Sequence, residues 1–134
     1  MRTLSYEEAV RFHGHNGPFL ALGYKAGSYA MEKLRPERLL DIECSVETII
    51  KKPYTCVIDG IQCSTYCTLG KGNLKLKSSS EKRIGITFRS KGKEVRLVLK
   101  PHTLERVLTT EDLEREAEWV NGELIGSLFE IEEI

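Results

Sequence analysis

The stretch PFLALGYKAGSYAMEKL, residues 18–34, decides how this chain folds. Proline is favoured in the first turn of a helix, and the pair Arg35-Pro36 ends the segment, so we expect one helix between them. Glycine and alanine recur there every three or four positions, which places them along one face of the helix. Such a stripe of small residues predicts that this helix packs very closely against another element.

Two further elements flank this helix in the sequence. Ser5, with Glu8 three residues later, forms a capping-box pattern that predicts a short helix running towards Phe12. After the long helix, the alternating pattern between Ile42 and Ile50 predicts a half-buried strand. The first part of the chain is therefore expected to run helix, helix, strand.

The next part carries another helix and a group of strands. Thr55 is the expected N-cap of a buried helix from Cys56 to about Cys67, because cysteine and glycine recur there at intervals of three and four. A glycine-rich turn then leads into three strands, which we expect to pair as an antiparallel meander. The expected strands are residues 74–78, 83–89 and 94–100.

After Pro101 the sequence becomes helical again. Thr110 is expected to cap a helix from Asp112 to about Val120, and Asn121-Gly122 breaks this helix before an apolar and acidic end. The order of these elements predicts an α+β fold, in which an antiparallel β-sheet packs against helices.

Size and composition indicate one domain. The chain has 134 residues, 40% of them hydrophobic, and no linker or internal repeat divides it, so we expect residues 1–134 to form a single domain. The first fifteen residues lack a secretory signal pattern, and no apolar run approaches the roughly 20 residues that span a bilayer. We therefore expect a cytoplasmic protein with no membrane partner, whose four cysteines are reduced thiols.

The charge is unevenly distributed along a chain whose net charge is zero. Residues 71–100 carry ten Lys and Arg against two Glu, whereas residues 101–134 carry two Arg against ten Asp and Glu. Either the basic strands and the acidic tail cancel each other, within the chain or across a homodimer, or the basic strands form a wall for a small anionic ligand. Nucleic acid is not expected as a partner, because Phe88 is the only aromatic residue of the basic stretch.

The residues suited to chemistry gather in two segments. His13 and His15 lie in a glycine-rich run, and Cys56 and Asp59 open the buried helix. A cysteine at a helix N-terminus, after two lysines, is expected to favour the reactive thiolate, and Asp59 is placed to orient a histidine or to bind a metal. Each residue also has a structural interpretation, namely packing for the histidines, a small buried apolar group for Cys56 and a helix-dipole partner for Asp59.

Spacing limits how these residues combine. On one continuous helix Cys56 and Cys67 lie about 16 Å apart, too far for both thiolates to bind one metal ion. In an extended loop His13 and His15 face opposite ways, and we favour His15 as the histidine that points into the site.

The turn Gly70-Lys71-Gly72-Asn73 has a sequence typical of a loop that holds an anion. It lacks the Walker pattern, so we exclude nucleotide hydrolysis. Two interpretations stay open: a plain glycine-rich turn, or a substrate-binding loop in which backbone N–H groups and Lys71 hold an anionic group.

Three ordered motifs give the sequence a family resemblance. They are Phe12-His13-Gly14-His15 with Pro18 and Leu20-Ala21-Leu22-Gly23-Tyr24, then Cys56-x-x-Asp59-x-Ile61-Gln62, and last Cys67-Thr68-x-Gly70-Lys71-Gly72-Asn73-Leu74. In this combination the chain resembles the FmdE family, the E-type subunits of formylmethanofuran dehydrogenase. The resemblance is to a short form without the cysteine-rich zinc-binding extension.

The resemblance implies a frequently dimeric core domain, found in archaea and anaerobic bacteria, with a divalent metal, zinc by expectation, near the histidine and cysteine motifs. We therefore predict His13, His15, Cys56 and Cys67 as metal ligands. His15, Cys56 and Asp59 are the predicted catalytic residues, and Gly70, Lys71, Gly72 and Asn73 the predicted substrate-binding residues. The family usually has a cysteine two residues after the second histidine, where this chain has Gly17.

Three hypotheses about function follow. The first is a metal-binding accessory protein that associates with other subunits of a formylmethanofuran dehydrogenase or a related oxidoreductase of one-carbon metabolism. The second is a free-standing small enzyme, in which a metal or Cys56 acts on a small anionic molecule. The third is a metal-free homodimeric scaffold.

Overall fold

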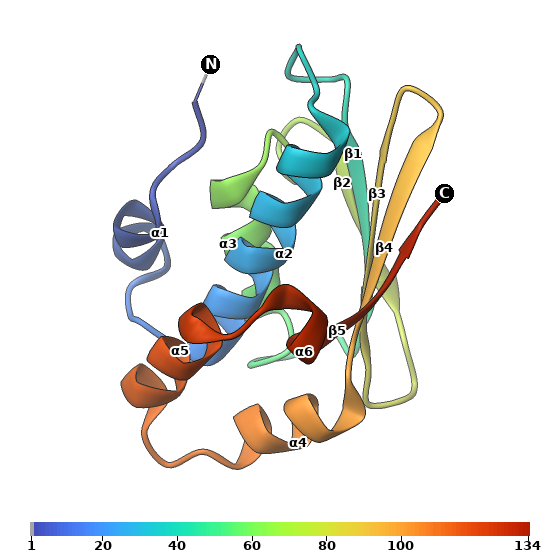
Figure 1. Ribbon diagram of the computed structural model, residues 1–134. Coiled ribbons are helices and arrows are strands. Elements are labelled where there is room, and N and C mark those ends of the chain that lie inside the picture. Colours follow the sequence, from blue (N-terminus) through green and yellow to red (C-terminus); the bar gives the residue numbers. More distant parts are fainter. Residues whose placement is uncertain (1) are drawn as a thin grey trace.

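The chain folds into two layers, a β-sheet and a set of helices that cover one of its faces (Figure 1). This computed structural model describes residues 2–134. In chain order the described elements are α1 (Tyr6–His13), α2 (Pro18–Leu34), β1 (Glu43–Thr48), α3 (Cys56–Ser64), β2 (Leu74–Ser78), β3 (Ile84–Ser90), β4 (Lys93–Leu99), α4 (Pro101–Thr109), α5 (Leu113–Gly122), α6 (Ile125–Leu128) and β5 (Phe129–Glu133). The predicted α+β class is confirmed.

Helix α2 packs directly against α3, backbone to backbone. A Cβ atom added at Gly23 would lie 2.0 Å from the carbonyl oxygen of Val57, and one added at Gly60 would lie 2.3 Å from the carbonyl oxygen of Leu20. At Gly27 the added atom would lie 2.1 Å from the Ser64 hydroxyl oxygen, so a third glycine is needed along the same contact. The close packing predicted from the small-residue stripe is confirmed, and α3 is its partner.

The sheet is mixed, with the strand order β2-β1-β3-β4-β5. Strand β1 pairs in parallel with β2, and all the other neighbours are antiparallel. The predicted meander is therefore wrong for residues 74–78, which lie beside β1 at the edge of the sheet. The physical reason is that α3 connects β1 to β2, a helical crossover that brings parallel strands together, whereas alternation of residues does not specify a strand's partner.

Helix α3 starts where predicted but ends earlier. Thr55 occupies the N-cap position as expected, although its side chain makes no capping hydrogen bond. The helix ends at Ser64, before the predicted end at Cys67, because the Thr65 hydroxyl donates to the Ile61 carbonyl and accepts the N–H of Cys67. Cys67 therefore lies in the loop that follows the helix.

The N-terminal caps of α1 and α5 test the other capping predictions. The capping box at Ser5 is confirmed, since the side chains of Ser5 and Glu8 bond each other's backbone N–H groups. The cap of α5 is Asp112, whose carboxylate accepts the N–H of Arg115, rather than the predicted Thr110. The acidic end of the chain adds β5, a strand that the sequence pattern did not reveal.

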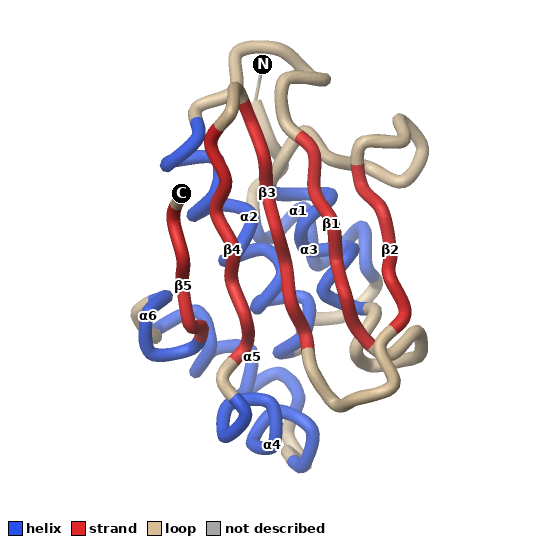
Figure 2. Tube along the Cα trace, turned by 90° about the vertical axis from the view of Figure 1, so that its right-hand side faces the viewer, coloured by secondary structure: helices blue, strands red, loops and turns tan. Residues whose placement is uncertain are grey.

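The core lies between the sheet and the helices. The residues that each strand turns towards the helices are buried, among them Cys44, Val46, Ile84, Ile86, Phe88, Val95, Leu97 and Leu99. Figure 2, which is turned so that the right-hand side of Figure 1 faces the viewer, shows the strands in front of the helices, so no described helix covers the second face of the sheet. No helix within residues 2–134 has the length and apolar character needed to cross a membrane.

A first prediction concerns the contact between α2 and α3. Gly60→Ala should lower the free energy of unfolding by about 3 kcal/mol, because its methyl group would overlap the backbone of α2. Urea denaturation followed by circular dichroism measures this change. The matched control is Gly126→Ala, where an added Cβ meets nothing within 4 Å, and its stability should stay within about 0.5 kcal/mol of the wild type. Equal urea midpoints for the two variants would contradict the packing described here.

Candidate functional site

The site begins where α1 ends against α3. His13 is the last residue of α1, and Gly14 caps the helix in a left-handed conformation with φ of 107°. The Nδ1 atom of His13 lies 2.6 Å from Oδ2 of Asp59, which stands one turn inside α3. The histidine side chain is only 10% exposed, and its Nε2 atom is buried with no hydrogen-bond partner among residues 2–134. A buried polar atom without a partner is costly, so Nε2 of His13 marks this pair as a candidate site for a ligand.

His15 lies beside this pair. The ring centroids of His13 and His15 are 4.7 Å apart, and His15 is exposed. The expectation that the two rings face opposite ways is wrong, because the left-handed Gly14 turns the chain between them. The structure also fixes His13, and not the favoured His15, against Asp59.

Gly17 marks a position directly next to the His15 ring. A Cβ added there would lie 2.8 Å from Cε1 and 3.1 Å from Nδ1 of His15. The backbone of Gly17 is extended, with φ of −136°, so the position is open to other residues once the His15 ring moves slightly. A side chain at position 17 would therefore belong to the same site.

Two residues that the sequence motifs did not mark hold the loop between α1 and α2. The hydroxyl of Tyr6 donates to Oδ1 of Asn16 at 2.6 Å, and burial raises the pKa of Tyr6. The Tyr6 ring also packs edge-on against Tyr24 of α2, with centroids 5.4 Å apart. No sequence signal could have found this contact, which depends on the way α1 docks on α2.

Cys56 lies at the start of α3, partly buried, one turn before Asp59. Burial and the Asp59 carboxylate raise the pKa of its thiol, and the opposing effect of Lys52 is smaller. The expectation that Cys56 favours the thiolate is therefore wrong. Cys63, on the same helix, is buried between α1 and α2 beside Ala9 and Leu20, where burial raises its pKa to about 11.

Cys67 belongs to the core under the sheet. It is fully buried, its Sγ atom lies 3.8 Å from the carbonyl oxygen of Ile42, and burial raises its pKa to about 11. Across residues 2–134, no three His, Cys, Asp or Glu side chains form a group that could hold one metal ion. The four predicted ligands, His13, His15, Cys56 and Cys67, are thus not brought together within one chain.

The predicted substrate-binding loop makes structural contacts. The Asn73 side chain is buried, donates to the carbonyl groups of Leu39, Ile42 and Tyr66, and accepts the N–H of Thr68. The ammonium group of Lys71 bonds the Thr68 hydroxyl of its own loop at 2.9 Å. Gly72 supplies a positive φ of 79° at the turn, and Gly70 is exposed. These contacts favour the interpretation of residues 70–73 as a structural turn.

The fold and the site together define a small α+β protein with a histidine and carboxylate pair between two helices. Residues 12–128 match the family described as "FmdE, Molybdenum formylmethanofuran dehydrogenase operon". The chain belongs to this FmdE family, as the resemblance implied.

Among the proteins similar to the chain are one from an archaeon and one of known crystal structure. A "Probable S-adenosyl-L-methionine-binding protein" of Archaeoglobus fulgidus is 37% identical over 109 residues, and the chain spans 29% of that protein's length. The crystal structure of a tungsten formylmethanofuran dehydrogenase FmdE-like protein from Syntrophus aciditrophicus superposes with a TM-score of 0.63 at 23% identity, over 100% of this chain and 77% of that one. The second similarity supports the fold.

A second prediction tests the structural role of Asn73. Asn73→Ala should lower the free energy of unfolding by roughly 3 kcal/mol, because it leaves several buried backbone groups without a partner. Lys71→Ala is the control, since it removes one exposed hydrogen bond and should cost less than about 0.5 kcal/mol. Denaturant titration of both variants checks this, and an Asn73→Ala variant as stable as the wild type would overturn the assignment.

A third prediction concerns the protonation of Cys56. The reaction of its thiol with iodoacetamide should still be accelerating above the usual cysteine pKa of about 9, because the thiolate is the reacting form. Asp59→Asn should increase the rate at a fixed pH, since it removes a nearby negative charge. Mass spectrometry of the Cys56 peptide measures both rates, and a rate that is already constant above about pH 7 would contradict the raised pKa.

Proposed function

We propose that this chain is a metal-binding accessory protein of the FmdE family, with its metal centre at His13 and His15. One observation carries the proposal: Asp59 holds Nδ1 of His13 and leaves Nε2 buried without a partner. Histidines that bind metals through one nitrogen commonly donate the other N–H to a carboxylate, which fixes the ring and raises the basicity of the ligand.

The residues present fit a divalent ion that takes nitrogen ligands. Nε2 of His13 and a ring nitrogen of His15 would hold it, and Asp59 would orient His13. Zinc prefers four ligands, or three and a water molecule, so two histidines leave positions for water, for a small anion or for a residue of a partner subunit. When bound, the metal would supply a Lewis acid to a molecule at those open positions. Cys56 lies one turn from Asp59 on α3, so its thiol is the candidate for a further metal ligand.

The family membership supports an accessory role. We propose that the chain associates with subunits of a formylmethanofuran dehydrogenase-type oxidoreductase, which carries out the redox chemistry of one-carbon metabolism. We further propose that it acts in the cytoplasm and forms a homodimer, through which a second copy contributes to the open positions of the metal centre. The support is the small ligand set of one chain and the uneven charge of residues 71–134.

Two other functions have weaker support. A thiol-dependent enzyme acting through Cys56 is disfavoured by the raised pKa of that thiol. Binding of S-adenosyl-L-methionine is suggested by the name of the Archaeoglobus fulgidus relative, but this chain corresponds to 29% of that protein. Calorimetric titration with this compound separates it from the metal proposal.

A fourth prediction tests the metal centre. Wild-type protein purified without chelator or nickel resin should contain close to one divalent metal ion per site, measured by elemental analysis and by titration with zinc. His13→Ala should lose it, and Asp59→Asn should weaken binding by about 10- to 100-fold. His102→Ala, at an exposed histidine outside the site, and Cys67→Ala, in the core, should keep the metal. Loss of metal in the His102→Ala or Cys67→Ala variant alone would contradict the assignment.

Gly17→Cys provides a test in the opposite direction. It places a thiolate beside the His15 ring, where related proteins usually carry cysteine, and should tighten zinc binding by at least about tenfold. Unchanged affinity in a folded Gly17→Cys variant would mean that His15 does not face the metal. If the wild type binds no metal while its fold is intact, the metal-free scaffold becomes the better description.

A further inference from the structure

The uncovered face of the sheet carries a row of polar side chains that runs across four strands. Ser45 of β1 is the register partner of Lys75 of β2 and of Thr87 of β3, and Thr87 is the partner of Arg96 of β4. Residues in register on neighbouring strands turn their side chains to the same face, here the face without helices (Figure 2). Two hydroxyl groups therefore lie side by side with a cation at each end of the row.

The middle of this face is hollowed because its side chains are short. Ser45 and Thr87 form the floor together with Gly85, which has no side chain. Two adjoining hollows, of about 220 and 170 Å³, share Ser45, Lys77 and Arg89 among their lining residues. The longer basic side chains of the surrounding positions form the rim.

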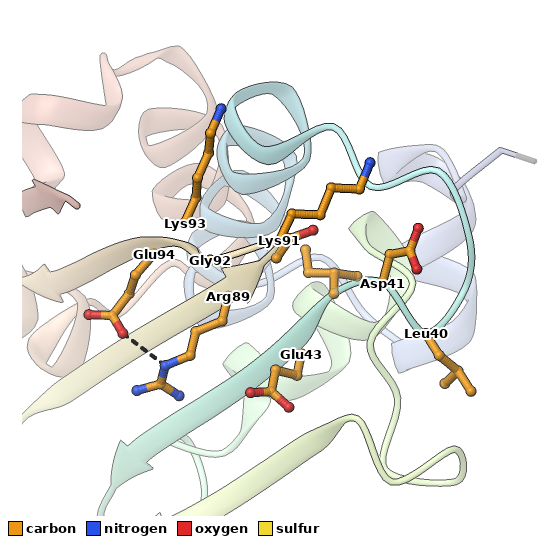
Figure 3. Close-up of a pocket in the computed structure, with 10 residues that line it drawn as sticks. Leu40, Asp41, Glu43, Arg89, Lys91, Gly92, Lys93 and Glu94 are labelled. Carbon is orange, nitrogen blue, oxygen red and sulfur yellow. Dashed lines mark hydrogen bonds and ion pairs between the residues drawn. The ribbon is translucent and has the colours of Figure 1, made fainter.

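The rim carries more basic side chains than acidic ones. Arg89 bonds Glu94 at 2.8 Å, and Arg83 lies 3.6 Å from Glu47. Figure 3 shows Arg89, Glu94 and Glu43 on one side of the strands, while Lys91 and Lys93 extend in the other direction. Arg89 also lines the neighbouring hollow drawn there, whose charges are balanced.

Three other cations of this face have no such partner. Among the described residues, the side chains of Lys75, Lys77 and Arg96 make no ion pair or hydrogen bond. The acidic groups nearest to them along the strands are Glu47, the register partner of Lys77, Glu132, the register partner of Arg96, and Glu43 of the rim. None of these carboxylates forms an ion pair with the three cations among the described residues. Three cations without an ion pair of their own therefore lie around the hydroxyl groups of Ser45 and Thr87.

We propose that this hollow, named the sheet-face site and formed by Ser45, Lys75, Lys77, Thr87 and Arg96, binds a small phosphate-bearing anion. Hydroxyl and guanidinium or ammonium donors are the groups that recognise phosphate oxygens, and charge-assisted hydrogen bonds of this kind are the strong ones. The shallow, open shape suits the end of a molecule that carries two linked phosphates. This site lies on the opposite side of the sheet from the helices that carry His13 and Asp59, so it is independent of the proposed metal centre.

The test is titration of the full chain with inorganic pyrophosphate at low ionic strength, followed by calorimetry and by amide NMR shifts. The protein used is the His13→Ala variant treated with chelator, so that a metal at the other site cannot bind the probe. Shifts should be largest at Ser45, Gly85 and Thr87. Lys77→Gln/Arg96→Gln should weaken binding at least about tenfold, whereas the matched double variant Lys33→Gln/Arg115→Gln, which removes two exposed charges elsewhere, should not.

A second titration with a nucleoside diphosphate distinguishes the source of the phosphate group. Tighter binding than pyrophosphate assigns the site to a nucleotide-like ligand, and equal binding assigns it to the diphosphate alone; both support the site. No binding of either probe at millimolar concentration would overturn it, as would equal weakening by the control variant. Binding of single-stranded nucleic acid without binding of pyrophosphate would also overturn it.

Discussion

The backbone contact between α2 and α3 is the constraint on which the rest of the structure depends. Gly23 and Gly60 let the two helices touch main chain to main chain, which no other residue allows at these distances. Because α3 lies this deep in the helical layer, its outer side is left for α1, and the carbonyl of Cys63 accepts the N–H of Leu4 there. Asp59 lies on the side of α3 where His13 arrives, so the packing of two helices sets the geometry of the site.

The same helix also determines the sheet. Helix α3 connects β1 to its parallel neighbour β2. Because the two strands are parallel, the loop after α3 must bring the chain back beside the first residues of β1, where β2 starts. The Asn73 side chain holds this loop in place. It donates hydrogen bonds to the carbonyl groups of Ile42, just before β1, and of Tyr66, just after α3. The contacts of the third motif of the sequence, Cys67 to Leu74, therefore serve the crossover.

Sequence predicted the features that local physics determines. The small-residue stripe specified close helix packing, and the capping box at Ser5 specified the start of α1. The parallel pairing of β2 was not predictable, since an alternating pattern fits any neighbouring strand. Cys56 shows a different limit: its lysine neighbours are visible in the sequence, but its burial and the closeness of Asp59 depend on the folded structure. His13 was less favoured than His15 for the same reason, because only the docking of α1 on α3 brings it to Asp59.

The most direct test of the metal centre is anomalous X-ray diffraction at the zinc absorption edge, on crystals of the protein grown with zinc and without chelator. The account predicts a peak about 2.0 to 2.1 Å from Nε2 of His13, with Asp59 still bonded to Nδ1. A peak only at Cys67 or at exposed side chains, with Nε2 of His13 bonded to protein or water, would contradict it.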